Sequence, residues 1–226
     1  MKDLQTLRKE LMEETRKKLK KSIGEEAVLF QEYHALDELS KTINKLSVKL
    51  TEWFSSYVPE ITKLETQEEI LKLILLKDKR TIINELGEKE TIGSETKKGY
   101  EEALELAEHI KGLIGYKEKL EGKISELTKE IAPHTCEVVN PIVLAHLLTK
   151  VGGLSKLARM PSTAIQLIGA EKALFRHLRD KKNNPPKYGL LSGAVDAKDN
   201  KEKAKKTKQL ASKIAIAARR DYYGSK

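Results

Sequence analysis

Two runs of apolar residues, spaced alternately three and four apart and each ended by a proline, constrain this fold most. That spacing is the a/d pattern of a coiled coil, and Pro59 and Pro133 end the runs because proline cannot donate the next helical hydrogen bond. The first seam is Leu36, Leu39, Ile43, Leu46, Leu50, Trp53 and Tyr57. The second is Ala103, Leu106, Ile110, Leu113, Lys117, Leu120, Ile124, Leu127 and Ile131. Only Lys117 breaks the apolar pattern, and a single polar a-position often fixes the register or the partner.

If the two seams pair within one chain they run antiparallel, because the segment between them brings the chain back. We therefore expect a coiled-coil domain over 30–133, with helices at about 30–58 and 100–132 and a helical tip at about 60–99. The tip should hold two short helices, anchored by Leu71, Ile74, Leu75, Ile82, Ile83 and Leu86. This is more apolar surface than a small tip buries alone, which favours self-association through the tip or the coiled coil. Whether the seam closes within one chain or is exchanged between two stays open.

The segments on either side of the coiled coil lie outside the two heptad seams. Residues 1–29 are expected to form a charged, amphipathic linker helix, and 134–226 a compact helical domain. Within that domain, the lysine-rich stretch 196–208 is expected to be a mobile loop, followed by a last helix that stops at Gly224. Few alternating β-branched runs occur, so the predicted fold class is all-α: a long antiparallel coiled coil with a helical tip, followed by a compact helical domain.

The charge is unevenly distributed along the chain. The formal net charge is +9, yet residues 134–226 hold 19 basic against 7 acidic residues, and the preceding part holds 24 against 27. A basic second part suggests that this part alone meets a polyanion such as RNA or DNA. The alternative is a solvated basic face without a partner.

Several classes of function lack the residues that they need. The one cysteine, Cys136, cannot form an internal disulfide and fits a reducing compartment. No apolar stretch reaches the length of about 18 residues of a membrane span, and the first residues lack the apolar centre of a signal peptide. His134 and Cys136 are too few for a zinc site, and Gly152 and Gly153 lack the spacing of a phosphate loop. We expect an intracellular, soluble protein without a metal, a cofactor, an active site or a membrane contact.

The stretch "LIGAEKALFRHL" at 167–178 combines cationic and apolar residues. Gly169 can adopt positive φ, and a helix that restarts at about Ala170 would present outward-facing amides to an anion. One face of that helix would carry Lys172, Arg176 and Arg179. Its neighbouring faces would carry Leu174, Phe175 and Leu178, which we expect to anchor the helix in the core. An ordinary surface helix and a binding helix are both compatible with this pattern.

Longer motifs in the same region resemble one family. "GGLSKLARMPSTAIQLIGAEKALFRHL", "PPKYG" and "ASKIAIAARRDYYG" closely resemble the Nop domain, found in core proteins of box C/D RNA-guided methylation particles and in a spliceosomal relative. "KLTEWFSSYVPEI" at 49–61 resembles the stretch that leads into the coiled coil of that family. The resemblance covers about residues 30–224, and "GAEKALFR" fits the archaeal and nucleolar branch better than the spliceosomal branch.

The resemblance implies a non-catalytic scaffold for RNA-guided 2′-O-methylation and rRNA processing. Its Nop domain would bind a kink-turn guide RNA after a small, ribosomal-protein-like kink-turn-binding protein has docked, while the coiled coil self-associates. The implied contacts to that ribonucleoprotein are Arg159, Gln166, Gly169, Ala170, Glu171, Lys172, Ala173, Leu174, Phe175, Arg176 and Lys187, to which the helical spacing adds Arg179. The implied location is the cytoplasm of an archaeal cell, or the nucleolus of a eukaryotic one.

One departure from the family pattern bears on the partners. Members of this branch carry a further N-terminal domain that recruits the methyltransferase fibrillarin, and we expect that domain to be missing from this chain. Fibrillarin would then be a partner of the full-length protein only. The rival interpretations are a spliceosomal-type Nop protein, a coiled-coil adaptor without a nucleic-acid role, and an enzyme with an unrecognised pocket.

Overall fold

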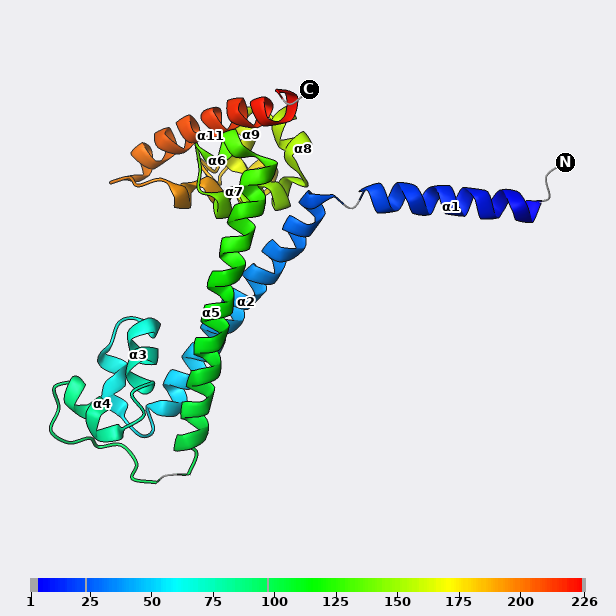
Figure 1. Ribbon diagram of the computed structural model, residues 1–226. Helices are drawn as coiled ribbons and strands as arrows, with labels where there is room; N and C mark the ends of the chain where they lie inside the picture. Colours follow the sequence, from blue (N-terminus) through cyan, green and yellow to red (C-terminus); the bar gives the residue numbers. More distant parts are fainter. Residues whose placement is uncertain (1–3, 23, 97, 225–226) are drawn as a thin grey trace. The chain divides into compact units, whose positions relative to one another are not determined.

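The structure, a computed structural model, describes residues 4–22, 24–96 and 98–224, and over these ranges it consists of helices and loops without a strand (Figure 1). The predicted all-α class is confirmed. No described helix is long and apolar enough to span a membrane. The helices are α1 (Leu4–Ser22), α2 (Glu25–Phe54), η1 (Pro59–Lys63), α3 (Gln67–Ile74), α4 (Lys79–Glu85), α5 (Tyr100–Ile131), α6 (Pro133–Cys136), α7 (Pro141–Val151), α8 (Leu154–Arg159), α9 (Ser162–Leu167), α10 (Glu171–Arg179), η2 (Leu190–Ala194) and α11 (Asn200–Tyr223).

The chain divides into two compact units, and α2 and α5 contribute to both. Unit 1 consists of Met1–His34 and Gly122–Lys226, and unit 2 of Ala35–Glu121. The N-terminal segment, expected as one linker helix over 1–29, is instead interrupted: α1 ends at Ser22 and α2 begins at Glu25.

In unit 2, α2 and α5 run antiparallel and bury the apolar row that the heptads predict (Figure 1). The fully or nearly fully buried positions of this row are Leu36, Ile43, Leu50, Ala103, Ile110 and Leu120, and Ala107, which is not in the predicted row, is buried as well. Leu39, Leu46, Leu106 and Leu113 lie half-buried beside them. In unit 1, α5 continues the same face with the buried Ile124 and the half-buried Leu127. Lys117 is half-buried, and its ammonium lies 3.7 Å from the Glu121 carboxylate.

The seam prediction is wrong at Trp53. This side chain is 40% exposed, whereas its neighbour Phe54 is completely buried. The buried row steps by four residues from Leu50 to Phe54, because a straight helix turns once per 3.6 residues and drifts away from a 3.5-residue repeat. The helix then ends at Phe54, so that Tyr57 is buried from the following turn.

The tip covers most of its own apolar surface. Both predicted short helices form, as α3 and α4, and each starts with a side-chain cap: Thr66 accepts from the Glu69 amide and Asp78 from the Thr81 amide. Of the predicted anchors, Leu71, Ile74, Ile82 and Ile83 are buried in one cluster with Ile70, Phe54, Tyr57, Val58 and Ile61, and Leu75 and Leu86 pack half-buried against it. The chain thus covers most of these residues itself, while Leu76 is 45% exposed, and self-association stays a prediction.

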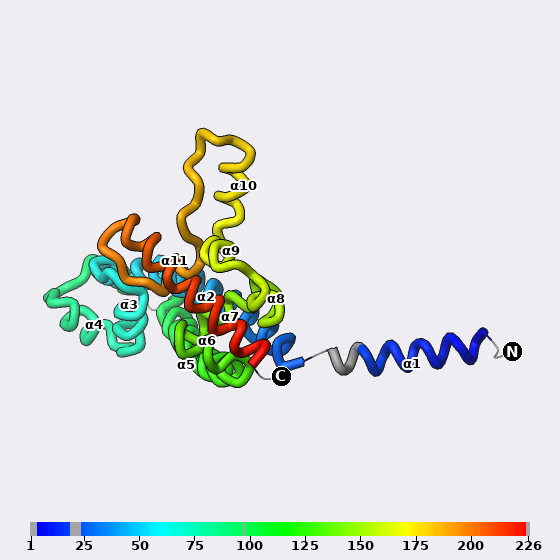
Figure 2. Tube along the Cα trace, turned by 90° about the horizontal axis from the view of Figure 1, so that it is seen from above, coloured from blue at the N-terminus to red at the C-terminus, as the bar shows by residue number. Residues whose placement is uncertain are grey.

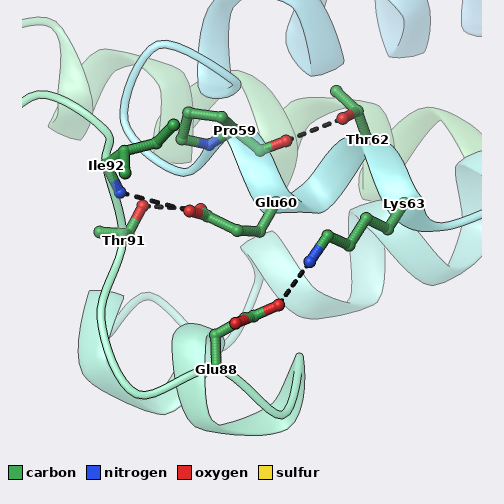
Figure 3. Close-up of polar contacts among 7 residues, drawn as sticks. All are labelled: Pro59, Glu60, Thr62, Lys63, Glu88, Thr91 and Ile92. Atoms are coloured by element: carbon green, nitrogen blue, oxygen red, sulfur yellow. Dashed lines mark hydrogen bonds and ion pairs between the residues drawn. The ribbon is translucent and has the colours of Figure 1, made fainter.

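A carboxylate in η1 holds the returning chain against the tip (Figure 3). Glu60 accepts a hydrogen bond from the Thr91 hydroxyl at 2.6 Å and one from the Ile92 amide at 3.3 Å. The Thr91 hydrogen bond lowers the pKa of Glu60, since it favours the charged form. Lys63, one turn further on, pairs with Glu88, so the same short helix holds the chain at two points (Figure 3).

In unit 1, α11 packs along α6, α8, α9 and η2. Its buried face includes Ala211, Ile214 and Ala218. The predicted mobile loop at 196–208 is wrong from Asn200 onward, because α11 already begins there. Asp199 caps the helix by accepting from the Glu202 amide at 2.7 Å, which gives a lysine-rich stretch a defined start.

A buried carboxylate near the end of α11 joins it to α6. The Asp221 side chain is inaccessible to solvent and accepts hydrogen bonds from the His134 and Thr135 amides at 2.9 and 2.8 Å. The Thr135 hydroxyl donates to it at 2.6 Å, and the His134 Nδ1 lies 2.6 Å away. Asp221 thus caps the N-terminus of α6, where the chain turns out of α5.

The first turns of α2 also belong to unit 1 and hold α7 and α8. The Glu26 carboxylate accepts from the Leu154 amide at 2.8 Å, at the N-terminus of α8. Tyr33 stacks on His146 of α7 with ring centroids 4.9 Å apart. Gly153 has φ +118°, a backbone conformation that favours glycine, and a Cβ there would stand 2.5 Å from a Glu26 oxygen and displace that side chain.

Replacement of Asp221 by alanine is expected to destabilise the protein by about 2–4 kcal/mol, because it leaves buried amides and a hydroxyl without an acceptor. The measurement is urea unfolding followed by circular dichroism. Asp199→Ala serves as the matched control, since the loss of an exposed helix cap costs about 1 kcal/mol. Equal losses in the two variants would contradict the role assigned to Asp221.

Candidate nucleic-acid interface

The turn between α9 and α10 depends on a glycine in the left-handed region. Gly169 has φ +88°, and a Cβ there would lie 3.2 Å from the backbone nitrogen of Leu190. A residue with a side chain would be strained at this φ and would also have to displace Leu190. The predicted positive φ at Gly169 is confirmed.

The segment that follows α9 lies directly against the segment that precedes η2. The Gly189 amide donates to the Gln166 carbonyl at 2.9 Å, and the Leu190 amide to the Ile168 carbonyl at 2.7 Å. A Cβ on Gly189 would stand 2.0 Å from the Ile168 oxygen, so the close approach requires glycine. The Gln166 side chain adds a third link by donating to the Lys187 carbonyl at 2.5 Å. Residues 166–168 and 187–190 are therefore joined into a base, from which α10 and the return loop that follows it extend.

Glu171 occupies the position where an external anion was expected. Helix α10 starts at Glu171, and the carboxylate of that residue accepts from the Gly169 amide at 2.7 Å. Hydrogen bonds from the Gly169 amide and from its own amide lower the pKa of Glu171. The predicted anion site at the start of this helix is therefore not open at Gly169, since a carboxylate of the chain already satisfies that amide.

Helix α10 buries none of its residues, contrary to the expectation that its apolar side chains anchor it in the core. Phe175 is 66% and Leu178 54% exposed, and only Leu174 is half-buried. The reason is visible in Figure 2, where α10 and the loop after it project away from α9 and α11. Lys172, Arg176 and Arg179 are exposed on one face, at the predicted helical spacing.

The return loop is held at its far end and at its base. His177 Nδ1 lies 2.5 Å from the Asn183 carbonyl, and the Asn183 amide donates to the Asp180 carbonyl at 3.1 Å. Closer to the base, the Tyr188 hydroxyl donates to Asn200 at the start of α11, at 2.8 Å. The Lys203 ammonium lies 5.8 Å from the centre of the Tyr188 ring. These contacts hold α10 in position even though no residue of the helix is buried.

The candidate residues that offer a polar group outside the cationic face of α10 fall into two groups. Gln166, Gly169, Glu171 and Lys187 are brought together at the base, whereas Arg159 ends α8 beside the tyrosines at the end of α11. The Arg159 guanidinium donates hydrogen bonds to the Tyr222 and Tyr223 hydroxyl oxygens, and these bonds raise its pKa. Ala170 and Ala173 lie on the turn and first residues of α10 without a polar group to offer.

We call α10 together with its return loop, residues 171–188, the arm. Sequence reasoning missed the residues that hold this arm in place. Gly189 and Tyr188 stand in the "PPKYG" motif, and a glycine that follows two prolines could have indicated a close backbone approach. His177 carried no such signal, because its partner is a backbone carbonyl six residues away.

The described residues offer little for other chemistry. Burial raises the pKa of the Cys136 thiol to about 11, so this thiol remains protonated at neutral pH. Over the same described ranges, no group of three or more His, Cys, Asp or Glu side chains is arranged to hold a metal ion.

The Glu171 brace is expected to weaken as the pH falls. A carboxylate whose pKa is lowered in the folded state gives its stabilisation above the unfolded pKa of about 4.3 and loses it as the pH falls through the folded pKa. The amide resonance of Gly169 should therefore titrate with a midpoint below about 4.3 in NMR spectra. Glu171→Gln should abolish this titration, and Glu25→Gln should leave it intact. A midpoint at or above the ordinary value would contradict the hydrogen bond.

Comparisons with known proteins identify the family. A family model described as the Nop snoRNA-binding domain, fibrillarin, matches residues 35–226. A NOP5 family protein of Methanocaldococcus jannaschii is 33% identical over 93% of this chain and 56% of its own length. Nucleolar protein 58 of Candida glabrata is 34% identical over 91% of this chain and 44% of its own length.

A solved structure has the same fold. A chain in a crystal structure of a fibrillarin/Nop5p complex matches with a TM-score of 0.54 and 23% identity, covering 98% of this chain and 71% of that chain. The chain spans about half the length of the curated relatives that it matches. Because the family model covers most of the sequence, this chain belongs to the Nop family.

Proposed function

We propose that this chain is a non-catalytic scaffold of a box C/D-type ribonucleoprotein. It binds a kink-turn guide RNA on which a ribosomal-protein-like kink-turn-binding protein already sits, and it pairs two such assemblies through its coiled coil. The observation that carries the proposal is α10, a helix that is braced at its base and buries none of its residues.

The cationic face of α10 suits an RNA backbone. Lys172, Arg176 and Arg179 point to one side, and within the described part of the chain none of them has an ion-pair partner. Contacts between such side chains and phosphates give affinity and orientation without sequence choice. The family model, described as a snoRNA-binding domain, includes this helix.

The apolar side chains of the same helix favour a composite partner. Phe175 lies beside the cationic row, and Leu178 extends the apolar surface on the next face. Exposed apolar side chains next to charged ones are typical of a surface that another molecule covers. RNA that carries a bound protein offers phosphates, stacked bases and apolar protein surface at one place, so it matches both faces of α10.

The outer face of α5 supports self-association. Gly112 and Gly115 stand on this face, and nothing lies within 4 Å of where their Cβ atoms would be. Glycine inside a helix costs about 0.5–1 kcal/mol relative to alanine, yet it allows another backbone to come close. Tyr116 and Val48 of unit 2 are also exposed, at 59% and 45%. A second coiled coil can pack against these side chains.

The names of the relatives support a proposal for a further partner and for the location of the protein. The solved neighbour is part of a fibrillarin complex, and we propose fibrillarin as the partner that supplies the methyltransferase activity. Nucleolar protein 58 relatives favour the nucleolus if the source is eukaryotic, and the archaeal NOP5 relative favours the cytoplasm of an archaeal cell.

Replacement of Lys172 and Arg176 by alanine is expected to weaken binding to a box C/D kink-turn RNA that carries its primary binding protein. If each side chain contacts a phosphate, the slope of log K against log salt should fall by about 0.9 per residue for duplex-like RNA. Gel shifts and anisotropy between 50 and 200 mM salt measure both quantities, and Lys45→Ala with Lys89→Ala removes the same charge from unit 2. An unchanged slope, or no supershift even with the unaltered chain, would contradict the proposal and favour a coiled-coil adaptor.

Replacement of Gly112 and Gly115 by glutamine is expected to have two opposite effects. Glutamine has the better helix propensity, so the thermal stability of a monomer should rise by about 1 kcal/mol or more. The added side chains should at the same time block close packing, so a dimer measured by sedimentation at micromolar concentration should dissociate. A chain that is strictly monomeric before the substitution would contradict self-association.

A further inference from the structure

One face of α11 is fixed in the core, which determines the face that it turns to solvent. Thr207, Ala211, Ile214 and Ala218 are buried against the rest of unit 1, and Asp221 holds the end of the helix to α6. The opposite face begins with Lys201, Lys205 and Lys208, all exposed, which we call the lysine row. These residues follow one another at steps of four and three, so they lie on one line along about 10 Å of helix.

The lysine row differs from Lys203 and Lys206 of the same helix, because those two lysines have partners within the chain. Lys206 pairs with Glu202 at 2.8 Å and donates to the Asp196 carbonyl at 2.6 Å, and Lys203 lies over the Tyr188 ring. Over the described part of the chain, no ion pair or side-chain hydrogen bond engages the ammonium group of Lys201, Lys205 or Lys208.

The acidic groups of this helix are already occupied. α11 contains eight basic and two acidic residues. Of the two, Glu202 is bound to Lys206, and Asp221 is bound to His134 and Thr135. Like charges at i,i+3 and i,i+4 repel one another, so the row weakens the helix unless an external anion lies along it.

We propose that the lysine row is a second RNA contact of this protein, which binds the phosphate backbone of an RNA helix outside the kink-turn. The inference rests on the proposed function only in taking RNA as the polyanion. Three ammonium groups, one per helical turn, match a partner with regularly spaced negative charges, and neutralising phosphates releases counterions. A row without aromatic or amide side chains between its lysines offers no means of reading bases, so the contact is independent of sequence.

The surroundings of the row favour RNA over a membrane. A helix that lies on a membrane inserts a continuous apolar face into the lipid. Most apolar residues of α11 are buried or half-buried in unit 1, and its exposed Ile216 and Tyr223 lie further along the helix than the lysine row. The return loop touches the start of α11 through Tyr188, but α10 itself projects away from α11, so its cationic face and the lysine row are different surfaces (Figure 2). A guide RNA longer than its kink-turn can therefore contact both surfaces of the same unit.

The test uses the whole chain and a fluorescein-labelled RNA duplex of about 20 base pairs without a kink-turn, a length that provides more phosphates than the row contacts. Lys201, Lys205 and Lys208 are replaced together by glutamine, which preserves helix propensity. The matched control replaces Lys45, Lys89 and Lys98 of unit 2 by glutamine, because these exposed lysines carry the same total charge. Circular dichroism verifies that both variants are folded, and anisotropy between 50 and 200 mM KCl gives the affinity and its salt dependence.

The row variant should lower the salt slope by about two to three, given about 0.7–0.9 per phosphate contact, and should raise the dissociation constant at least tenfold at 100 mM KCl. The control variant should change the dissociation constant less than threefold. Equal effects of the two variants would overturn the proposal, since net charge alone would then explain binding. A larger loss on phosphatidylserine vesicles or on polyglutamate than on RNA would also overturn it.

Failure of this inference is distinguishable from failure of the proposed function. Lys172→Ala should impair the assembly of kink-turn RNA and its protein but leave binding to the plain duplex unchanged. The lysine-row variant should impair duplex binding in every case. One outcome separates the two: the unaltered chain does not bind the kink-turn assembly, while the row variant still binds the duplex more weakly than the unaltered chain does. The proposed function is then contradicted, and the lysine row remains supported as an RNA contact.

Discussion

The buried Asp221 carboxylate is the interaction on which the arrangement of unit 1 depends. It lies at the end of α11, yet its hydrogen-bond donors belong to α6, some 86 residues earlier in the chain. A carboxylate taken out of water is tolerated only when several donors surround it, and here two amides, a hydroxyl and an imidazole do so. With that end fixed and the alanine-rich face packed inward, α11 can turn its cationic side only toward solvent. The same contact fixes the point where the chain leaves α5 and enters α6.

The elements that the sequence predicted well are those governed by one periodicity. The heptad spacing of Leu36, Ile43 and Leu50 predicted α2, its pairing with α5 and most of the buried seam. The periodicity failed at Trp53, because the difference between 3.6 and 3.5 residues per turn accumulates toward the end of a long helix. It also gave no account of the tip, where the apolar residues of α3 and α4 are covered by Phe54 and Tyr57 of the same chain.

The candidate site was predicted less well, for reasons that lie in its tertiary contacts. The apolar residues of α10 have a helical pattern that resembles a core-facing helix, and only the projection of the arm leaves Phe175 exposed. The sequence pattern predicts Glu171 as an ordinary surface residue. In the structure its carboxylate accepts a hydrogen bond from the Gly169 amide and so holds the turn before α10. The lysine-rich start of α11 was taken for a loop by composition, although Asp199 followed by Glu202 is a helix-start pattern that could have been recognised.

The base of the arm has a consequence for how sequences of this kind can change over time. Gly169, Gly189 and Gln166 close the excursion from 166 to 190 at its base, where Ile168 is buried, and α10 extends beyond that base. Since α10 buries nothing, a substitution on its surface removes no core contact. On the proposed function, substitutions on the surface of α10 change binding while leaving folding nearly untouched, whereas substitutions of the two glycines strain the turn and the close backbone approach at the base. The proposed contact can therefore change residue by residue without compensating changes elsewhere in the chain.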